Sequence, residues 1–182
     1  MRTTQKRETR LEILTAANRV ILKGGPSDFT FEAVVKEAEL SKGGVLYHFP
    51  SKEALVKGML AAFLETLDRD LMERSKGDDG AGSLTRAYIM SAFEPEAYLL
   101  EVNAGMLAAM TTDPELLEPA QRWAKDFQTR LEQDGLDPIL TTLIRLATDG
   151  LWYNDMFGLT SLSQEAKSTL QQRLVALTQV PS

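Results

Sequence analysis

The residues best suited to chemistry lie between Ser41 and Lys52, in the stretch SKGGVLYHFPSK. Its lysine, histidine, tyrosine and serine side chains can all donate hydrogen bonds to an anion, and its two adjacent glycines let another molecule approach the backbone closely. Lys52 follows Ser51 in the expected first turn of a helix, where free backbone N–H groups attract anions and disfavour a cation. A lysine at such a position suits a phosphate group, because the ammonium and the helix end both attract it.

Local sequence signals place these residues on short helices separated by tight turns. Thr30 is expected to cap a helix that runs from residue 31 to about residue 38, whose apolar positions recur at spacings of three and four. Ser41 is expected to cap a second helix at residues 42–48, and Ser51 a third helix. Two short helices joined by a turn of three or four residues form a helix-turn-helix, the motif that places its second helix in the major groove of DNA.

The second of these helices contains Gly43 and Gly44. Each glycine costs a helix about 1 kcal/mol relative to alanine, so the pair costs about 2 kcal/mol. This cost is understandable if the helix backbone must lie close to another molecule, and the wall of a DNA groove is one such neighbour.

The run from Ser41 to Leu55, SKGGVLYHFPSKEAL, resembles the DNA-binding signature of the TetR family of transcriptional regulators. The resemblance is long and specific within the first 57 residues. Beyond residue 75 it rests on chain length, on the helical pattern and on the run DGLW at residues 149–152. The chain departs from the family at Glu39, a position in the turn where glycine is common. If this position needs a positive φ, Glu39 costs stability there and places a negative charge near DNA.

The DNA-contacting residues are expected to form two groups. We assign to the major-groove surface Lys42, Gly43, Gly44 and Val45. The resemblance implies phosphate contacts by Tyr47, His48 and Lys52, with hydroxyl or backbone contacts from Thr30 and Ser41. A single histidine is usually structural or merely exposed, so only the position of His48 within the motif favours a phosphate contact.

The charge is distributed unevenly along the chain. Residues 1–57 contain ten Lys and Arg against seven Asp and Glu, whereas the remaining residues contain ten against nineteen, which gives the net charge of −6. A basic head on an acidic body is typical of a DNA-binding protein with a second, regulatory part. A solvated helical surface would also explain a weakly basic segment, and only its coincidence with the motif favours DNA.

Composition narrows the class of protein. The chain has 182 residues, of which 43% are hydrophobic, and it has no cysteine, which excludes disulfides and thiol chemistry. Its first residues lack the apolar core of a signal peptide, and its apolar runs are far shorter than the roughly 20 residues of a membrane span. We therefore expect a cytoplasmic protein with no membrane contact.

The rest of the chain predicts helices and nothing that alternates with period two for long enough to form a strand. These further helices are expected at residues 6–23, 52–75, 84–93, 96–111, 115–134, 139–157 and 164–179. The expected fold is all-α, with about nine helices. The domain boundary is placed on the helix that follows Lys52, which gives a DNA-binding domain at 1–57 and a ligand-binding and dimerisation domain at 58–182.

Large, adaptable apolar side chains in the second domain form a candidate ligand pocket. The candidates are Asn103, Met106, Met110, Trp123, Phe127, Asp149, Trp152, Tyr153 and Met156. Methionine and aromatic side chains suit varied apolar ligands, and an inward acid would favour a cationic one. The expected effector is therefore an apolar or aromatic small molecule, with cationic ligands included. Such side chains at helical spacing are ordinarily core, and that alternative stays open for each of them.

Helix 139–157 is apolar on more than one side, so it must be covered on more than one side. The resemblance implies that the last two helices form a four-helix interface with their copies in a twofold homodimer. The candidate interface residues are Leu143, Ala147, Leu151, Leu170, Leu174 and Leu177. The alternative is a buried central helix in a monomer. A symmetric pair of recognition helices about 34–36 Å apart would read a palindromic operator.

The sequence thus favours a dimeric, ligand-responsive DNA-binding repressor. An enzyme is not expected, because the chain has no cysteine, one histidine, no glycine-rich phosphate loop and no metal-ligand spacing such as HExxH. No metal or cofactor is expected either. A helical ligand carrier or protein-interaction module is the alternative; it leaves the basic head, the paired glycines and Lys52 unexplained. Salt-dependent DNA binding separates the two.

Overall fold

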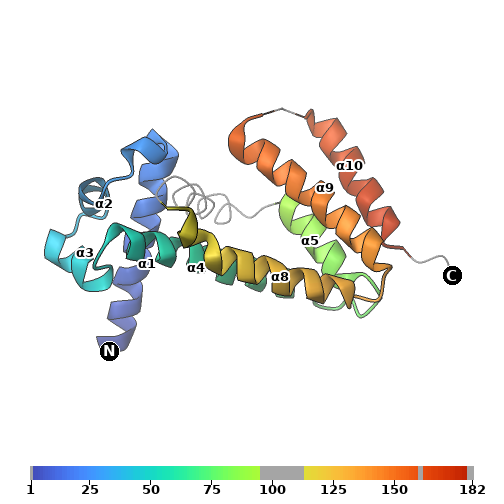
Figure 1. Cartoon of the computed structure of the whole chain (residues 1–182), viewed down its shortest axis with the longest axis horizontal. Coiled ribbons are helices and arrows are strands. Elements are labelled where there is room, and N and C mark those ends of the chain that lie inside the picture. Colours follow the sequence, from blue (N-terminus) through green and yellow to red (C-terminus); the bar gives the residue numbers. More distant parts are fainter. Residues whose placement is uncertain (1, 95–112, 160–161, 180–182) are drawn as a thin grey trace. The chain divides into compact units, whose positions relative to one another are not determined.

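The computed structural model describes residues 2–94, 113–159 and 162–179 (Figure 1). Within these ranges the regular structure is entirely helical, which confirms the all-α prediction. The α-helices are α1 (Arg2–Gly24), α2 (Phe31–Glu37), α3 (Lys42–His48), α4 (Lys52–Arg74), α5 (Ser83–Phe93), α8 (Glu118–Glu132), α9 (Pro138–Phe157) and α10 (Gln164–Leu177), with short 3-10 helices at η1 (Pro26–Asp28) and η2 (Pro114–Leu117). The helix expected at 96–111 lies outside the described residues.

The chain divides into two compact units. Of the described residues, those up to Glu65 and those from Asp113 to Gln121 belong to the first unit, which we call the head; the others belong to the second unit, which we call the body. Helix α4 contributes residues to both units. The boundary expected at residue 57 falls within this same helix and stays a prediction.

Side-chain caps begin the helices where the sequence predicts them. The residue before α2, α3, α4 and α10 accepts a hydrogen bond from the backbone N–H three positions later, with donor-to-acceptor distances of 3.0–3.1 Å; these caps are Thr30, Ser41, Ser51 and Ser163. Such caps satisfy N–H groups that have no partner within the helix. They fix the start of α3 and α4, and with it the direction in which each helix leaves its turn.

The turn between α2 and α3 requires a left-handed residue, and Glu39 supplies it with a φ of 55°. Glycine adopts this conformation freely, whereas another residue pays about 1–2 kcal/mol for it. The position therefore has the geometry for which glycine is expected, and the chain tolerates a strained glutamate there.

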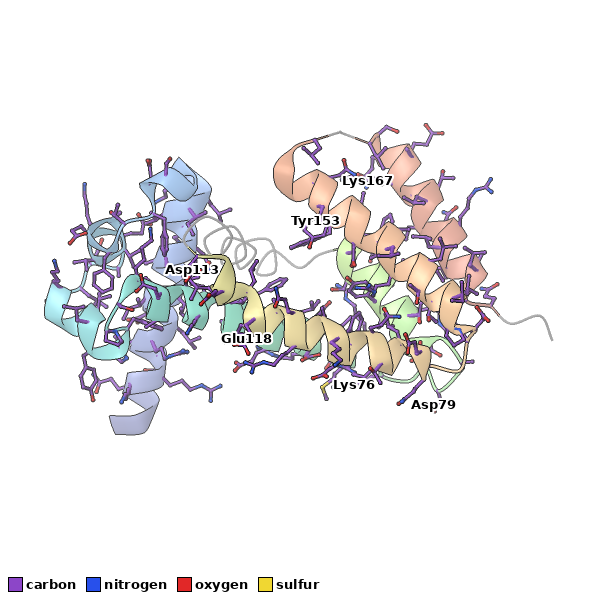
Figure 2. All side chains as sticks on the ribbon, viewed as in Figure 1. Lys76, Asp79, Asp113, Glu118, Tyr153 and Lys167 are labelled. Carbon is purple, nitrogen blue, oxygen red and sulfur yellow. The ribbon has the colours of Figure 1, made fainter. Side chains whose placement is uncertain are left out.

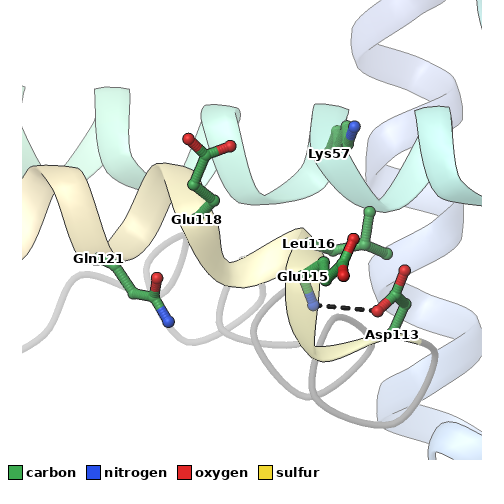
Figure 3. A pocket seen from close by; sticks show the side chains of 6 residues that line it. All are labelled: Lys57, Asp113, Glu115, Leu116, Glu118 and Gln121. Atoms are coloured by element: carbon green, nitrogen blue, oxygen red, sulfur yellow. Dashed lines mark hydrogen bonds between the residues drawn. The ribbon is translucent and has the colours of Figure 1, made fainter.

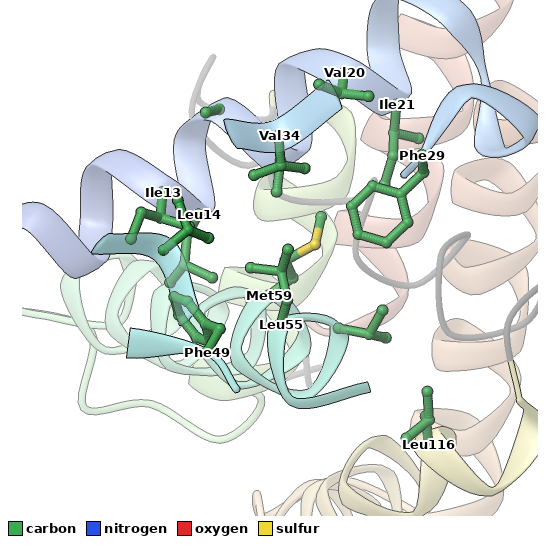
Figure 4. Packing of buried hydrophobic residues seen from close by; sticks show 14 residues of the cluster. Ile13, Leu14, Val20, Ile21, Phe29, Val34, Phe49, Leu55, Met59 and Leu116 are labelled. Carbon is green, nitrogen blue, oxygen red and sulfur yellow. The ribbon is translucent and has the colours of Figure 1, made fainter. Parts of the chain in front are cut away.

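A single apolar core holds the head together. Residues of α1, α2, α3 and α4 meet in it, and Leu116 of η2 joins them (Figure 4). Phe29 and Val34 both lie in this core, as expected for a hydrophobic staple across the start of α2. The core fixes α3 from behind, so that its other face stays on the surface.

Gly58 lets α4 pass close to the aromatic ring of Phe49. A Cβ atom added at Gly58 would lie 2.5 Å from Cε1 of Phe49, which is buried and cannot move aside. Gly58→Ala should therefore lower the free energy of unfolding. Overpacking a core costs about 1–3 kcal/mol, against the roughly 1 kcal/mol that alanine adds to a helix, so a net loss of up to about 2 kcal/mol is expected in urea unfolding.

Gly43→Ala is the matched control, because an added Cβ at Gly43 meets nothing within 4 Å among the described residues. This variant should gain up to about 1 kcal/mol from helix propensity. Equal stability changes in the two variants would show that the Phe49 ring does not constrain Gly58.

In the body, α5 packs against α9 and α10. Their contact is centred on Ile89, Ile144 and Leu174, which are buried. Lys167 of α10 also pairs with Asp155 near the end of α9, at 2.7 Å between Nζ and Oδ2 (Figure 2). None of the helices traced in the described ranges combines the length and the apolar character needed to cross a bilayer.

The start of α5 is capped from a distant part of the body. The residue before it, Gly82, has no side chain, and the carboxylate of Asp134 instead accepts hydrogen bonds from the backbone N–H groups of Leu84 and Thr85 at 3.1 and 2.8 Å. A carboxylate at a helix N-terminus is favourable for the helix dipole. Asp134 thus fixes α5, the helix that carries Tyr88, against the turn that follows α8.

Candidate functional site

Helix α3 presents one exposed face. Lys42, Gly43, Leu46 and Tyr47 share this face by helical spacing, and the side chain of Tyr47 is 71% exposed. Because a Cβ at Gly43 would enter open space, the backbone itself is accessible at this position. Leu46 was missed by the sequence analysis, although its spacing from Lys42 and Gly43 identifies the same face.

Two residues assigned to the groove surface do not lie on this face. Val45 is completely buried in the head core, so its expected contact with the groove is wrong. Its helical position turns it toward the core, away from Gly43 and Leu46. Gly44 lies beside the capping residue: an added Cβ would meet the Ser41 hydroxyl oxygen at 3.2 Å, and its N–H already donates to that oxygen.

The expected phosphate ligands lie on α3 and at the starts of α2, α3 and α4. Tyr47 and His48 lie edge to face with ring centroids 5.2 Å apart, and the Lys52 ammonium lies 5.0 Å from the ring centroid of Phe29. Nδ1 of His48 is buried and has no hydrogen-bond partner among the described residues. The hydroxyls of Thr30 and Ser41 accept their cap bonds and keep their own O–H groups for donation.

A carboxylate competes for the first lysine of α3. Lys42 Nζ lies 2.9 Å from Oε1 of Glu32 on α2, and the hydrogen bond from Lys42 holds the pKa of Glu32 below its ordinary value. Both side chains are exposed, so an arriving phosphate or base can take over the lysine. Glu32 was missed because the two residues lie on different helices and share no local pattern.

In the body, an aromatic row joins three of the expected ligand residues. The rings of Trp123 and Phe127 stack with centroids 4.8 Å apart, and Phe127 contacts the ring of Tyr88 at 4.7 Å. The Tyr88 hydroxyl donates a hydrogen bond to the carboxylate of Asp149, which also accepts one from Arg145 at 3.2 Å. The structure therefore brings Trp123, Phe127 and Asp149 together through Tyr88, which the sequence analysis did not identify.

Burial controls the protonation of Tyr88 and Asp149 at the end of this row. Burial raises the pKa of Asp149 above its ordinary value of 3.8, while the hydrogen bond from Tyr88 and the charge of Arg145 lower it in part. Burial, then the negative charge of Asp149, raises the pKa of Tyr88 well above 10. Tyr88 therefore stays protonated at neutral pH and acts as the donor.

Tyr88→Phe should lower the free energy of unfolding at neutral pH by about 1.5–3 kcal/mol, the range for a hydrogen bond to a charged partner. The deficit should shrink on acidification, because the hydrogen bond from Tyr88 favours the charged form of Asp149, so its loss raises the folded pKa further. In both proteins burial keeps the folded pKa above the unfolded value, so protonation favours the folded state, more strongly in the variant, and this contribution is lost as the pH rises through the folded pKa. Urea unfolding at neutral pH and near pH 3.8 measures both effects.

Tyr47→Phe removes the same hydroxyl from a mostly exposed side chain and serves as the control. Its stability should change by no more than about 0.5 kcal/mol. A pH-independent loss in Tyr88→Phe, no larger than that of the control, would contradict the role given to the Tyr88 hydrogen bond.

The other expected ligand residues are placed differently. Trp152 and Tyr153 contact each other with ring centroids 5.0 Å apart, and Tyr153 is exposed on α9 (Figure 2). Asn103, Met106 and Met110 lie outside the described residues, and of Met156 only the backbone is described.

The expected dimer residues fall into two groups. Leu143 and Leu177 are exposed, whereas Leu151 and Leu174 are buried within the body and Ala147 and Leu170 pack against its core. Leu151 and Leu174 are therefore covered by their own chain, and Leu174 packs with Ile89 of α5 and Ile144 of α9. The exposed side of α9 instead carries an apolar stripe at helical spacing, formed by Ile139, Leu143, Leu146, Gly150 and Tyr153.

A hollow of about 570 Å³ lies in the head, between α4 on one side and η2 with the first turn of α8 on the other (Figure 3). It is lined by Lys57, Asp113, Glu115, Leu116, Glu118 and Gln121. Three of these residues are acidic, and none is an expected ligand residue. Asp113 is already engaged, since its carboxylate accepts a hydrogen bond from the N–H of Glu115 at 3.0 Å.

Two protein-family descriptions match the chain. Residues 13–59 match "Bacterial regulatory proteins, tetR family", and residues 82–179, more than half of the chain, match "Tetracyclin repressor-like, C-terminal domain". A curated relative, the HTH-type transcriptional regulator TtgR of Pseudomonas putida, is 32% identical over 75 residues. This match covers 41% of the chain and 35% of TtgR, so it spans about a third of the relative's length.

Solved structures share the fold at low sequence identity. The multidrug binding protein EbrR complexed with malachite green is 23% identical, with a TM-score of 0.66 over 94% of this chain and 98% of that one. The SmeT–triclosan complex is 19% identical, with a TM-score of 0.70 over 93% of this chain and 90% of that one.

Proposed function

The chain belongs to the TetR family of bacterial regulators, and on this premise we propose that it is a homodimeric repressor that binds a palindromic operator and changes its DNA affinity when a small molecule binds the body. Regulators of this family are transcription factors and not enzymes. The proposed site of action is the cytoplasm, where a bacterial operator is found.

The observation that carries the proposal is the uncovered face of α3. Gly43 exposes the helix backbone between two side chains that can bind DNA, Lys42 and Tyr47. The Ser41 cap fixes the start of the helix, and the buried side chain of Val45 fixes its rear. A helix held rigidly with Gly43 on its outward face fits the major groove, where the backbone at this glycine can approach the base edges.

The proposed dimer interface consists of the apolar stripe of α9 and the exposed Leu177 of α10. Exposed apolar side chains at helical spacing are typical of a helix that packs on another helix. Gly150 lies within the stripe, and no described residue comes within 4 Å of where its Cβ would be, so a partner helix can approach closely there. A twofold dimer would present two copies of α3 to a palindrome.

The effector is proposed to bind in the body at or beside the aromatic row that ends at Asp149. The flat rings of Trp123 and Phe127 favour an aromatic ligand, and the half-buried carboxylate of Asp149 favours a cationic one. Malachite green and triclosan, bound by relatives of the same fold, are suitable first probes. Regulation would require two conformations of the dimer that differ in the distance between the two copies of α3. Either ligand can regulate DNA binding only if its affinity for these two conformations differs.

Lys52→Ala tests the DNA-binding surface directly. Losing one phosphate contact should weaken binding to operator and unrelated DNA by a similar factor, and it should reduce the slope of log K against log salt by about 0.9. Fluorescence anisotropy titrations with labelled duplexes at several salt concentrations measure both quantities. A loss confined to the operator would instead assign Lys52 to base recognition.

A further inference from the structure

Helix α1 begins well before the head core. The first of its residues in the core is Ile13, and the side chains described before it, from residue 5 to residue 12, are exposed or half-buried. Three turns of helix thus extend along the surface with little apolar burial to hold them, although helices in water are stabilised mainly by packing. Some other contact must favour the helical conformation of this segment.

Two cations of this segment rest on aromatic rings of the recognition helix and its cap. Lys6 Nζ lies 5.0 Å from the ring centroid of Tyr47, and Arg10 Cζ lies 5.0 Å from that of Phe49. The two cations are four residues apart and so lie on one face of α1. Cations at this distance from an aromatic face are held by the ring's quadrupole, so α1 delivers both charges to the edge of α3.

The charges of the segment are sorted around the helix. At 3.6 residues per turn, Glu8 and Glu12 fall on the side of α1 opposite Lys6 and Arg10. The face that lies beside Tyr47 is therefore basic, and the face turned away from it is acidic. A face that carries only cations, next to an exposed tyrosine with a hydroxyl to donate, is complementary to a sugar-phosphate backbone.

We propose that the amino-terminal half of α1 is a second DNA-binding element, in which Lys6 and Arg10 bind backbone phosphates beside the groove that α3 enters. Tyr47 positions Lys6 through its ring and donates its hydroxyl to the backbone, and Phe49 positions Arg10. The inference rests on the proposed DNA-binding function and extends it to residues outside the helix-turn-helix.

The inference is tested by salt titrations of the full-length variants Lys6→Ala and Arg10→Ala. The DNAs are an operator selected from a random pool of duplexes with the wild-type protein, and unrelated DNA. Each variant should lose about twofold to fivefold in affinity on both DNAs and reduce the slope of log K against log salt by about 0.9. Arg19→Ala is the matched control, because Arg19 shares the side of α1 that carries the two acids. It removes one positive charge from the same helix and should leave the slope unchanged.

A second measurement separates positioning from charge alone. In a Tyr47→Phe background, which keeps the ring, Lys6→Ala should lower DNA affinity by the same factor as it does in the wild-type background. In a Tyr47→Ala background, the further loss of DNA affinity caused by Lys6→Ala should fall below about twofold. Wild-type slopes in both Lys6→Ala and Arg10→Ala, with a wild-type protein that binds DNA, would overturn this inference and leave the proposed function intact. A wild-type protein that ignores DNA at low salt would overturn both.

Discussion

Gly43→Leu should destroy selectivity for the operator and leave the protein at least as stable as the wild type. Gly43 is exposed and an added Cβ meets no described residue within 4 Å, so the substitution should cost no packing. Leucine also favours a helix over glycine by about 1 kcal/mol. In the complex, however, it would hold the helix away from the base edges, where each good contact is worth about 1–3 kcal/mol. Operator affinity should fall at least about 100-fold, as measured by anisotropy, while binding to unrelated DNA changes little because it depends on phosphates.

Gly43→Ala gives a graded comparison at the same position. One methyl group should reduce operator affinity less than leucine does, and both variants should unfold at urea concentrations no lower than the wild type. If Gly43→Leu bound the operator as tightly as the wild type, the uncovered face of α3 would not be the DNA-reading surface.

Leu143→Glu should convert the protein to a monomer and reduce operator affinity at least about 100-fold. The side chain of Leu143 is 59% exposed within the apolar stripe on α9, so the substitution should leave the folded monomer intact. In the proposed dimer it would bury two unpaired carboxylates, one from each subunit, and leaving a buried charge uncompensated costs about 3–5 kcal/mol. Analytical ultracentrifugation and operator titration measure the two effects.

Leu22→Glu is the matched control, because Leu22 on α1 is 55% exposed and lies in the head. It introduces the same charge at a similarly exposed leucine and should leave the wild-type dimer intact. A Leu143→Glu protein with the wild-type sedimentation coefficient would rule out the α9 stripe as the interface. If instead both variants became monomeric, added charge alone would explain the result.

Local sequence signals predicted the helix-turn-helix closely. The caps at Thr30, Ser41 and Ser51 act on N–H groups three residues away, so a short window contains all the information that they need. The strained turn at Glu39 was likewise identifiable, because only the local chain geometry sets its φ. The expected bounds of α3 agree with the structure at both ends.

The errors and omissions concern which neighbour covers a given helix face. Periodicity shows that a helix has apolar sides, but it does not say whether a side meets its own chain or a partner. For this reason the burial of Leu151 and Leu174 within the body was not foreseen, and Val45 was assigned to the wrong face of α3. Contacts between distant segments, such as the hydrogen bond from Tyr88 to Asp149, leave no pattern in a single sequence.

The most direct test of the account is to select bound fragments from a random pool of DNA duplexes with the purified protein at two salt concentrations. The account predicts enrichment of a palindrome whose half-sites lie about one helical turn apart, recovered at both salt concentrations, with weaker overall binding at the higher one. Enrichment of no sequence, together with no retention of DNA at low salt, would contradict the account and favour a helical ligand carrier instead.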